Sequence, residues 1–111
     1  MIYIQHSPHA GAEMPGVHPL LVISTKEFNE TTNIVIGFPM THAKFHETNP
    51  FAVRLTGKKE GEVCFVITNQ PKSFDWKVRN ATPHPWGKGH ASILDQALQK
   101  LDAICGISGQ G

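Results

Sequence analysis

Short apolar runs alternate with polar and turn-forming residues through the first two thirds of the chain. β-Branched and aromatic residues are frequent in these runs, which is typical of short strands rather than helices. We predict strands over residues 2–5, 20–24, 33–38, 50–55 and 62–68. Pro39 is expected to end the third strand, and a charged hairpin turn over residues 57–61 to join the last two. Residues 25–32 are expected to form a turn or one helical turn, and residues 69–73 to break the last strand.

A helical period appears only near the C-terminus. Ser92 is a suitable N-cap, with Asp95 as its capping-box partner, and Gly106 follows as a stop. The apolar positions of this segment recur at helical spacing, and they are Leu94, Ala97, Leu98, Leu101, Ile104 and Cys105. We therefore predict a helix over 92–105 that packs on a small, strongly bent antiparallel sheet of about five strands. The fold class is mainly β, closed or nearly closed.

Composition limits the possible functions. The 111 residues are 40% hydrophobic and 17% charged, which indicates one globular domain over 1–111. The net charge of +1 means that a nucleic-acid ligand has to meet a local basic patch. No apolar run approaches the ~20 residues that cross a bilayer, and no signal peptide precedes the first strand, so we expect a cytoplasmic protein without a membrane partner. Cys64 and Cys105 lie in apolar segments and are expected to be buried free thiols.

Residues 11–19, Gly-Ala-Glu-Met-Pro-Gly-Val-His-Pro, form a loop rich in glycine and proline before the second strand. The loop carries a carboxylate, Glu13, and an imidazole, His18, which together can transfer protons. The alternative is that Glu13 only caps its loop while His18 packs beside Pro19.

The chain also has seven histidines, which raises the question of a metal site. His6 and His9 flank a proline, and His42 and His46 are four residues apart in a predicted loop. Neither pair has the accompanying cysteine or carboxylate spacing of a zinc site, so we predict neither a metal nor another cofactor.

Several short segments carry a more specific signal than this loop alone. They are Gly11-x-Glu13-x-x-Gly16-x-x-Pro19, Leu21-Val22-Ile23-Ser24 with Phe28-Asn29, Pro39-Met40-Thr41, Pro50-Phe51, and Gln70-Pro71-Lys72-Ser73-x-Asp75-Trp76-Lys77-x-Arg79. In this order and spacing they resemble the MazF/PemK/Kid toxins of toxin–antitoxin pairs. That family consists of small endoribonucleases that cut mRNA, with an SH3-like barrel and a C-terminal helix.

The resemblance implies a metal-independent endoribonuclease in which the 2′-hydroxyl of RNA attacks the adjacent phosphate. Glu13 and His18 would act as base and acid, and the Thr41 hydroxyl would donate to the scissile phosphate. Substrate binding would fall to His42, Gln70, Lys72, Ser73 and Trp76. For Thr41 a turn-stabilising hydrogen bond is an open alternative, for Lys72 a solvated surface position, and for Trp76 a place in the core or a dimer contact.

The chain departs from the family pattern at several positions. His18 replaces the usual arginine, Asn69 an acidic residue, Ala12 a histidine found in some members, and Ile67 a basic residue found in some members. The resemblance implies single-stranded RNA as substrate, a cognate antitoxin with an acidic tail as partner, and a homodimer. Two alternatives stay open: a toxin-like module that has lost catalysis and only binds RNA or protein, and a gyrase-poisoning toxin on the same fold.

Overall fold

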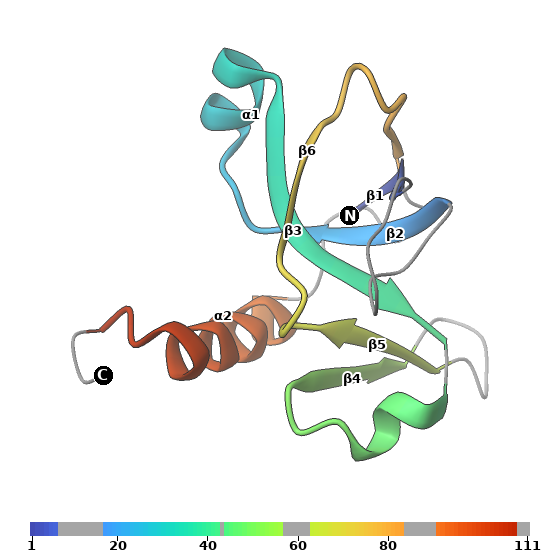
Figure 1. Ribbon diagram of the computed structural model, residues 1–111, viewed down its shortest axis with the longest axis vertical. Helices are drawn as coiled ribbons and strands as arrows, with labels where there is room; N and C mark the ends of the chain where they lie inside the picture. Colours follow the sequence, from blue (N-terminus) through green and yellow to red (C-terminus); the bar gives the residue numbers. More distant parts are fainter. Residues whose placement is uncertain (7–16, 43, 57–62, 84–90, 109–111) are drawn as a thin grey trace.

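A computed structural model describes residues 1–6, 17–42, 44–56, 63–83 and 91–108 of the protein (Figure 1). In chain order its elements are β1 (Ile2–Gln5), β2 (Val17–Val22), α1 (Lys26–Thr32), β3 (Ile34–Thr41), a 3-10 helix (Lys44–Thr48), β4 (Ala52–Thr56), β5 (Val63–Ile67), β6 (Lys72–Asp75), β7 (Thr82–Pro83) and α2 (Ala91–Cys105). A mainly β architecture with a C-terminal helix confirms the predicted fold class. The described residues form seven strands, so the expectation of about five was too low.

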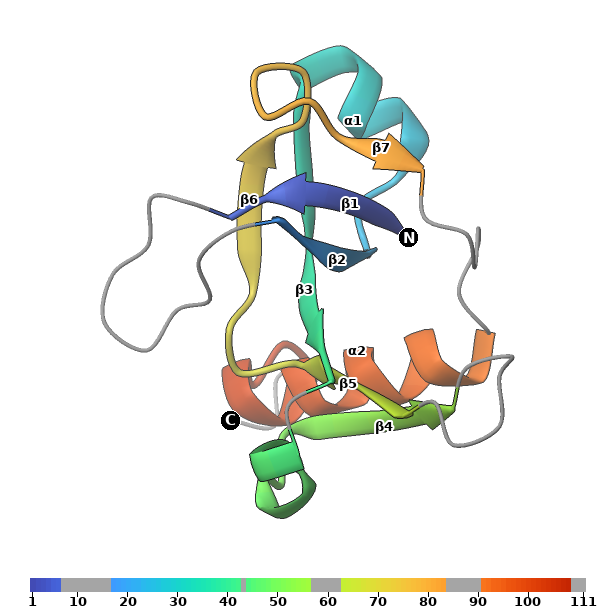
Figure 2. The same ribbon diagram turned by 90° about the vertical axis from the view of Figure 1, so that its right-hand side faces the viewer.

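The sheet is antiparallel and has β3 as its hub. The strand order is β4-β5-β3-β2-β1-β7, and β6 pairs with the first half of β3. Figures 1 and 2 show β1 and β2 crossing the long β3 while the β4–β5 hairpin lies at its far end. Gly37 permits this crossing, because a Cβ there would lie 2.8 Å from Leu20 Cγ and overlap the Leu21 carbonyl oxygen.

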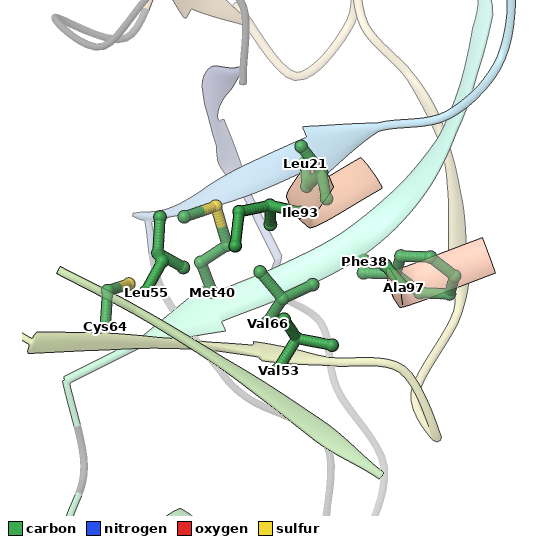
Figure 3. Close-up of a cluster of buried hydrophobic side chains, with 9 residues drawn as sticks. All are labelled: Leu21, Phe38, Met40, Val53, Leu55, Cys64, Val66, Ile93 and Ala97. Atoms are coloured by element: carbon green, nitrogen blue, oxygen red, sulfur yellow. The ribbon is translucent and has the colours of Figure 1, made fainter. Parts of the chain in front are cut away.

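The first core fills the space between α2 and strands β2 to β5 (Figure 3). Its nine buried residues are Leu21, Phe38, Met40, Val53, Leu55, Cys64, Val66, Ile93 and Ala97. The helix contributes Ile93 and Ala97, four residues apart on one face, with Leu101 packed at the edge. The predicted packing of the helix against the sheet is therefore present.

Details of the predicted helix need correction. Ser92 lies inside α2 rather than capping it, although Gly106 does follow the last helical residue with a φ of 66°. Leu98 and Ile104 are 39% and 42% exposed, because the stripe that meets the sheet is narrower than the apolar face of the sequence. Cys64 is buried as expected, but Cys105 is exposed, so the expectation for that thiol was wrong.

The second core lies on the opposite face of β2 and β3. It consists of the buried residues Ile4, Leu20, Val35 and Phe74, with Ile2, Val22, Trp76 and Ala81 packed against it. Leu20 belongs to this core and the next residue, Leu21, to the first core. Because successive strand residues point to opposite faces, both faces of β2 are covered by protein.

Some element boundaries also differ from the prediction. Pro39 does not end β3: it pairs with Leu20, after which Met40 and Thr41 pair with β5. The missing N–H of the proline thus falls where β3 exchanges one neighbour for another. Residues 25–32, predicted as a turn or one helical turn, contain the 7-residue helix α1 capped by the Thr25 side chain.

Two further segments complete this comparison. Strand β6 begins at Lys72, inside a segment that the sequence predicted to break strand structure. The predicted turn at 57–61 lies outside the described residues. None of the helices that the structure describes is long and apolar enough to cross a membrane.

Candidate functional site

The second core ends in basic side chains. On three strands, two apolar residues and then a basic one share the face that lines this core. The three series are Ile2, Ile4 and His6 along β1; Val22, Leu20 and His18 along β2; and Trp76, Phe74 and Lys72 along β6. His6 and Trp76 lie one residue outside their strands. The strand registers run these three series in the same direction. Arg79 joins them with its guanidinium 4.7 Å from the centre of the Phe74 ring. We call His6, His18, Lys72 and Arg79 the basic end of the second core.

His6 is the most enclosed of these residues, with 2% of its surface exposed. Its ring makes edge-to-face contacts with His18, at 5.7 Å between centroids, and with Phe74, at 5.0 Å. Burial lowers the pKa of His6 to about 4, and the positive charges of His18, Lys72 and Arg79 act in the same direction, against a smaller opposing effect of the His18 backbone. His6 is therefore uncharged at neutral pH.

The turn after β6 brings Arg79 back to β1. The Asp75 carboxylate accepts hydrogen bonds from the backbone N–H groups of Lys77 and Val78, at 3.0 and 2.9 Å. Arg79 then donates from Nη1 to the Gln5 carbonyl oxygen at 2.8 Å. Asp75 therefore caps this turn. At the other end of β6, burial lowers the pKa of Lys72.

His18 and Thr41 lie at the same end of two neighbouring strands. The β2–β3 pairing stops at Leu20 and Pro39, and His18 and Thr41 each lie two residues beyond that pair. Both residues are half-buried. Glu13, the expected partner of His18, lies outside the described residues, so their pairing stays a prediction.

The other predicted site residues are more dispersed. His42 is exposed, and its Nδ1 lies 2.6 Å from the Val63 carbonyl oxygen. Gln70 is half-buried and donates its backbone N–H to the Ile67 carbonyl oxygen. Ser73 is exposed on the opposite face of β6 from Lys72, as strand alternation requires.

Trp76 lies at the apolar end of the second core, away from the basic end along β6. Its indole Nε1 donates to the Asn29 carbonyl oxygen at 2.8 Å, and the Lys77 ammonium lies 5.5 Å from the ring centre. The ring also lines a 310 Å³ pocket together with Val22 and Val35. These contacts favour the structural alternative for Trp76 over a base-stacking role.

Sequence reasoning missed the place of His6 and Arg79 in this arrangement. It considered His6 only as a possible metal ligand with His9, which lies outside the described residues, and Arg79 only as part of a motif. The alternation Ile2, Ile4, His6 was the available signal, because it puts the imidazole on the core face of β1. Within the described ranges, no group of three histidine, cysteine or acidic residues is placed to hold a metal ion.

Comparison with known proteins places the chain in a family. The model of the PemK-like, MazF-like toxins of type II toxin–antitoxin systems matches residues 1–105. The endoribonuclease PemK of Escherichia coli is 34% identical over 98 residues, which is 87% of this chain and 72% of PemK. The endoribonuclease toxin MazF of E. coli K12 is 30% identical over 103 residues, which is 93% of this chain and 84% of MazF.

Solved structures agree with these sequence relatives. A crystal structure of MazF from Deinococcus radiodurans superposes with a TM-score of 0.80 at 28% identity, covering 95% of this chain and 91% of that one. A MazE–MazF crystal structure from the same organism gives a TM-score of 0.71 at 27% identity, with the same coverage. The chain belongs to the PemK-like, MazF-like family of toxins, as its motifs predicted.

Proposed function

We propose that this protein is a toxin that cuts single-stranded mRNA by metal-independent attack of the ribose 2′-hydroxyl, and that a cognate antitoxin neutralises it. The observation that carries the proposal is the match to the toxin family over residues 1–105, combined with the position of the His18 imidazole at the basic end of the second core. PemK and MazF, both at least 30% identical, are named endoribonucleases.

The chemistry needs three contributions: a base for the 2′-hydroxyl proton, an acid for the leaving 5′-oxygen, and donors for the charge that develops on the phosphate. Glu13 and His18 supply the first two in this proposal. The Thr41 hydroxyl and the Lys72 ammonium supply the donors for the phosphate. Thr41 lies at the end of β3 beside His18, and Lys72 belongs to the basic end itself. Gln70, Ser73 and His42 are proposed to contact the RNA around the scissile bond, whereas Trp76 keeps the structural role that its contacts favour.

An imidazole at position 18 changes what this position can do. The arginine of other members is always charged and grips phosphate with two parallel hydrogen bonds. An imidazole gives up that fork but can accept or donate a proton near neutral pH. An imidazole at position 18 can therefore take part in proton transfer, which an arginine there would not permit.

The same family membership supports the proposed partners. The Deinococcus relatives include complexes of MazF with MazE. We propose a cognate antitoxin for this chain, with an acidic segment that folds on binding, and a homodimeric toxin.

The decisive experiment is incubation of the purified protein with a long single-stranded transcript in EDTA. Discrete fragments, absent when the transcript carries 2′-O-methyl groups, would support the proposal. Lys26→Ala is a suitable control, since Lys26 is exposed on α1 and pairs only with Glu30 among the ion pairs of the described residues, at 3.8 Å. Intact RNA together with tight antitoxin binding would indicate a module without catalysis, and intact RNA with inhibited supercoiling a gyrase poison.

A further inference from the structure

His6 is an unusual residue to close an apolar core. Neither of its ring nitrogens makes a hydrogen bond of good geometry among the residues that the structure describes, although the His18 backbone lies close enough to favour the charged ring slightly. A buried polar group without a partner costs stability, so a phenylalanine or leucine would serve packing better. The neighbours of His6 on the same face of β1 are apolar, namely Ile2 and Ile4. The imidazole therefore needs an explanation other than packing.

The explanation lies in the ring that His6 contacts. His18, at 5.7 Å and edge-to-face, is the residue to which the proposed function gives a proton-transfer role. His6 itself is 2% exposed and cannot reach an RNA strand in this arrangement. The ring contact with His18 is therefore the direct link from His6 to a residue with a proposed proton-transfer role.

We propose that His6 is a positioning residue for RNA cleavage: a buried imidazole that orients the His18 ring through their edge-to-face contact. This inference rests on the proposed function. It adds to the proposed catalytic residues a buried neighbour that holds one of them in place.

Electrostatics explains why only one ring of the pair carries the proton. A charge on both rings would bring two like charges together at a place that also holds Lys72 and Arg79. Burial and these charges keep His6 neutral, so the half-buried His18 is the ring that exchanges protons with the substrate.

The test compares His6→Phe with the wild type in single-turnover RNA cleavage between pH 5 and 9, with EDTA present. Phe keeps the ring volume and removes both nitrogens, so we expect the melting temperature to rise, by roughly 4–8 °C, as the unpartnered groups disappear. We expect the cleavage rate to fall tenfold or more, up to about 10²-fold, because a misplaced catalytic group has that scale of effect. The loss should appear in the maximal rate, while the protein concentration that half-saturates cleavage stays close to that of the wild type, because His6 is buried and does not contact RNA.

Two further variants separate positioning from packing. His6→Gln returns a polar group to the site and should recover part of the cleavage rate that His6→Phe loses. His46→Phe is the matched control, because His46 is the other buried histidine of the described residues and lies beside Phe65 instead of His18. It should leave the cleavage rate and its pH profile unchanged.

The outcomes are distinct. A more stable His6→Phe variant with a lower maximal cleavage rate and an unchanged half-saturating concentration supports the inference. Wild-type rate and profile in His6→Phe, or an equal loss in His46→Phe, overturns it while the proposed function stands. A wild-type protein that leaves RNA intact overturns the proposed function, and this inference with it.

Discussion

The two cores share strands β2 and β3 but end differently. The first core is closed by Ile93 and Ala97 of α2 and contains only apolar residues and the Cys64 thiol. The second core continues from Leu20 and Phe74 into four basic side chains. Adjacent residues of β2, Leu20 and Leu21, serve one core each. One face of the sheet therefore carries an entirely apolar core, and the core on the other face ends in the candidate site residues.

This difference has a physical basis. Burying apolar surface stabilises the fold whatever lies around it, so the first core can be completed by any well-packed helix. Burying an imidazole beside other basic groups lowers stability, so a histidine at such a position indicates a role other than packing. The second core therefore differs from the first in containing a residue, His6, that lowers the stability of the fold. Substitutions in the two cores should have different effects.

The largest expected effect is on activity, at the basic end. His18→Ala should reduce the rate of RNA cleavage by about 10²–10⁴-fold, the usual contribution of a general acid or base. Because His18 is half-buried, the melting temperature should change little. Single-turnover cleavage and thermal unfolding of the same preparation measure both. An active His18→Ala protein would remove His18 from the proposed mechanism.

A truncation in the first core should do the reverse. Phe38 is fully buried, and Phe38→Ala should lower the free energy of unfolding by about 3–5 kcal/mol. Urea unfolding followed by circular dichroism measures this change. Cleavage by the fraction that remains folded should match the wild type. A catalytic defect in fully folded Phe38→Ala would mean that the two cores are not separate in function.

The pH dependence of stability should also distinguish the cores. His6 has a pKa of about 4 in the folded protein against 6.5 in the unfolded chain. Between these values the unfolded chain binds a proton at His6 that the folded chain does not, so stability falls as the pH drops from 6.5 to 4 and is unaffected by His6 above 6.5. The advantage of His6→Phe over the wild type in urea unfolding should grow over that range. Parallel curves would contradict the burial of a neutral imidazole.

Gly37 joins the two cores, because β2 crosses β3 there. Gly37→Ala should cost about 1–3 kcal/mol, since the added Cβ overlaps the Leu21 carbonyl and crowds Leu20. Chemical denaturation of the variant measures the loss. An unchanged stability would show that β2 can move away from β3 without cost.

The smallest effect is expected at the apolar end of the second core. Trp76→Phe removes the hydrogen bond to the Asn29 carbonyl and should cost roughly 0.5–1.5 kcal/mol. Affinity for a non-cleavable 2′-O-methyl RNA should stay close to that of the wild type if Trp76 is structural. A large loss of affinity with little loss of stability would restore the base-stacking role.

The sequence predicted local features well where one short signal decided them. The bounds of β1 match the predicted residues 2–5, and α2 ends where Gly106 follows it. The family motifs led directly to the fold class. Prediction failed where residues distant in sequence determine the structure. Pro39 stays in β3 because β3 changes neighbours there. Leu98 is exposed because the sheet covers only part of the apolar face of α2.

By itself, the sequence determined the family, the mainly β fold and the chemical types available for catalysis. These depend on residue identity and spacing, which are properties of the chain alone. Only the tertiary structure decided that His6 and His18 form a ring pair and that Lys72 and Arg79 gather around them. Those residues come from β1, β2, β6 and the turn that follows, and their distances depend on how the sheet bends at Gly37. The bend arises from contacts between strands, so no local pattern records it.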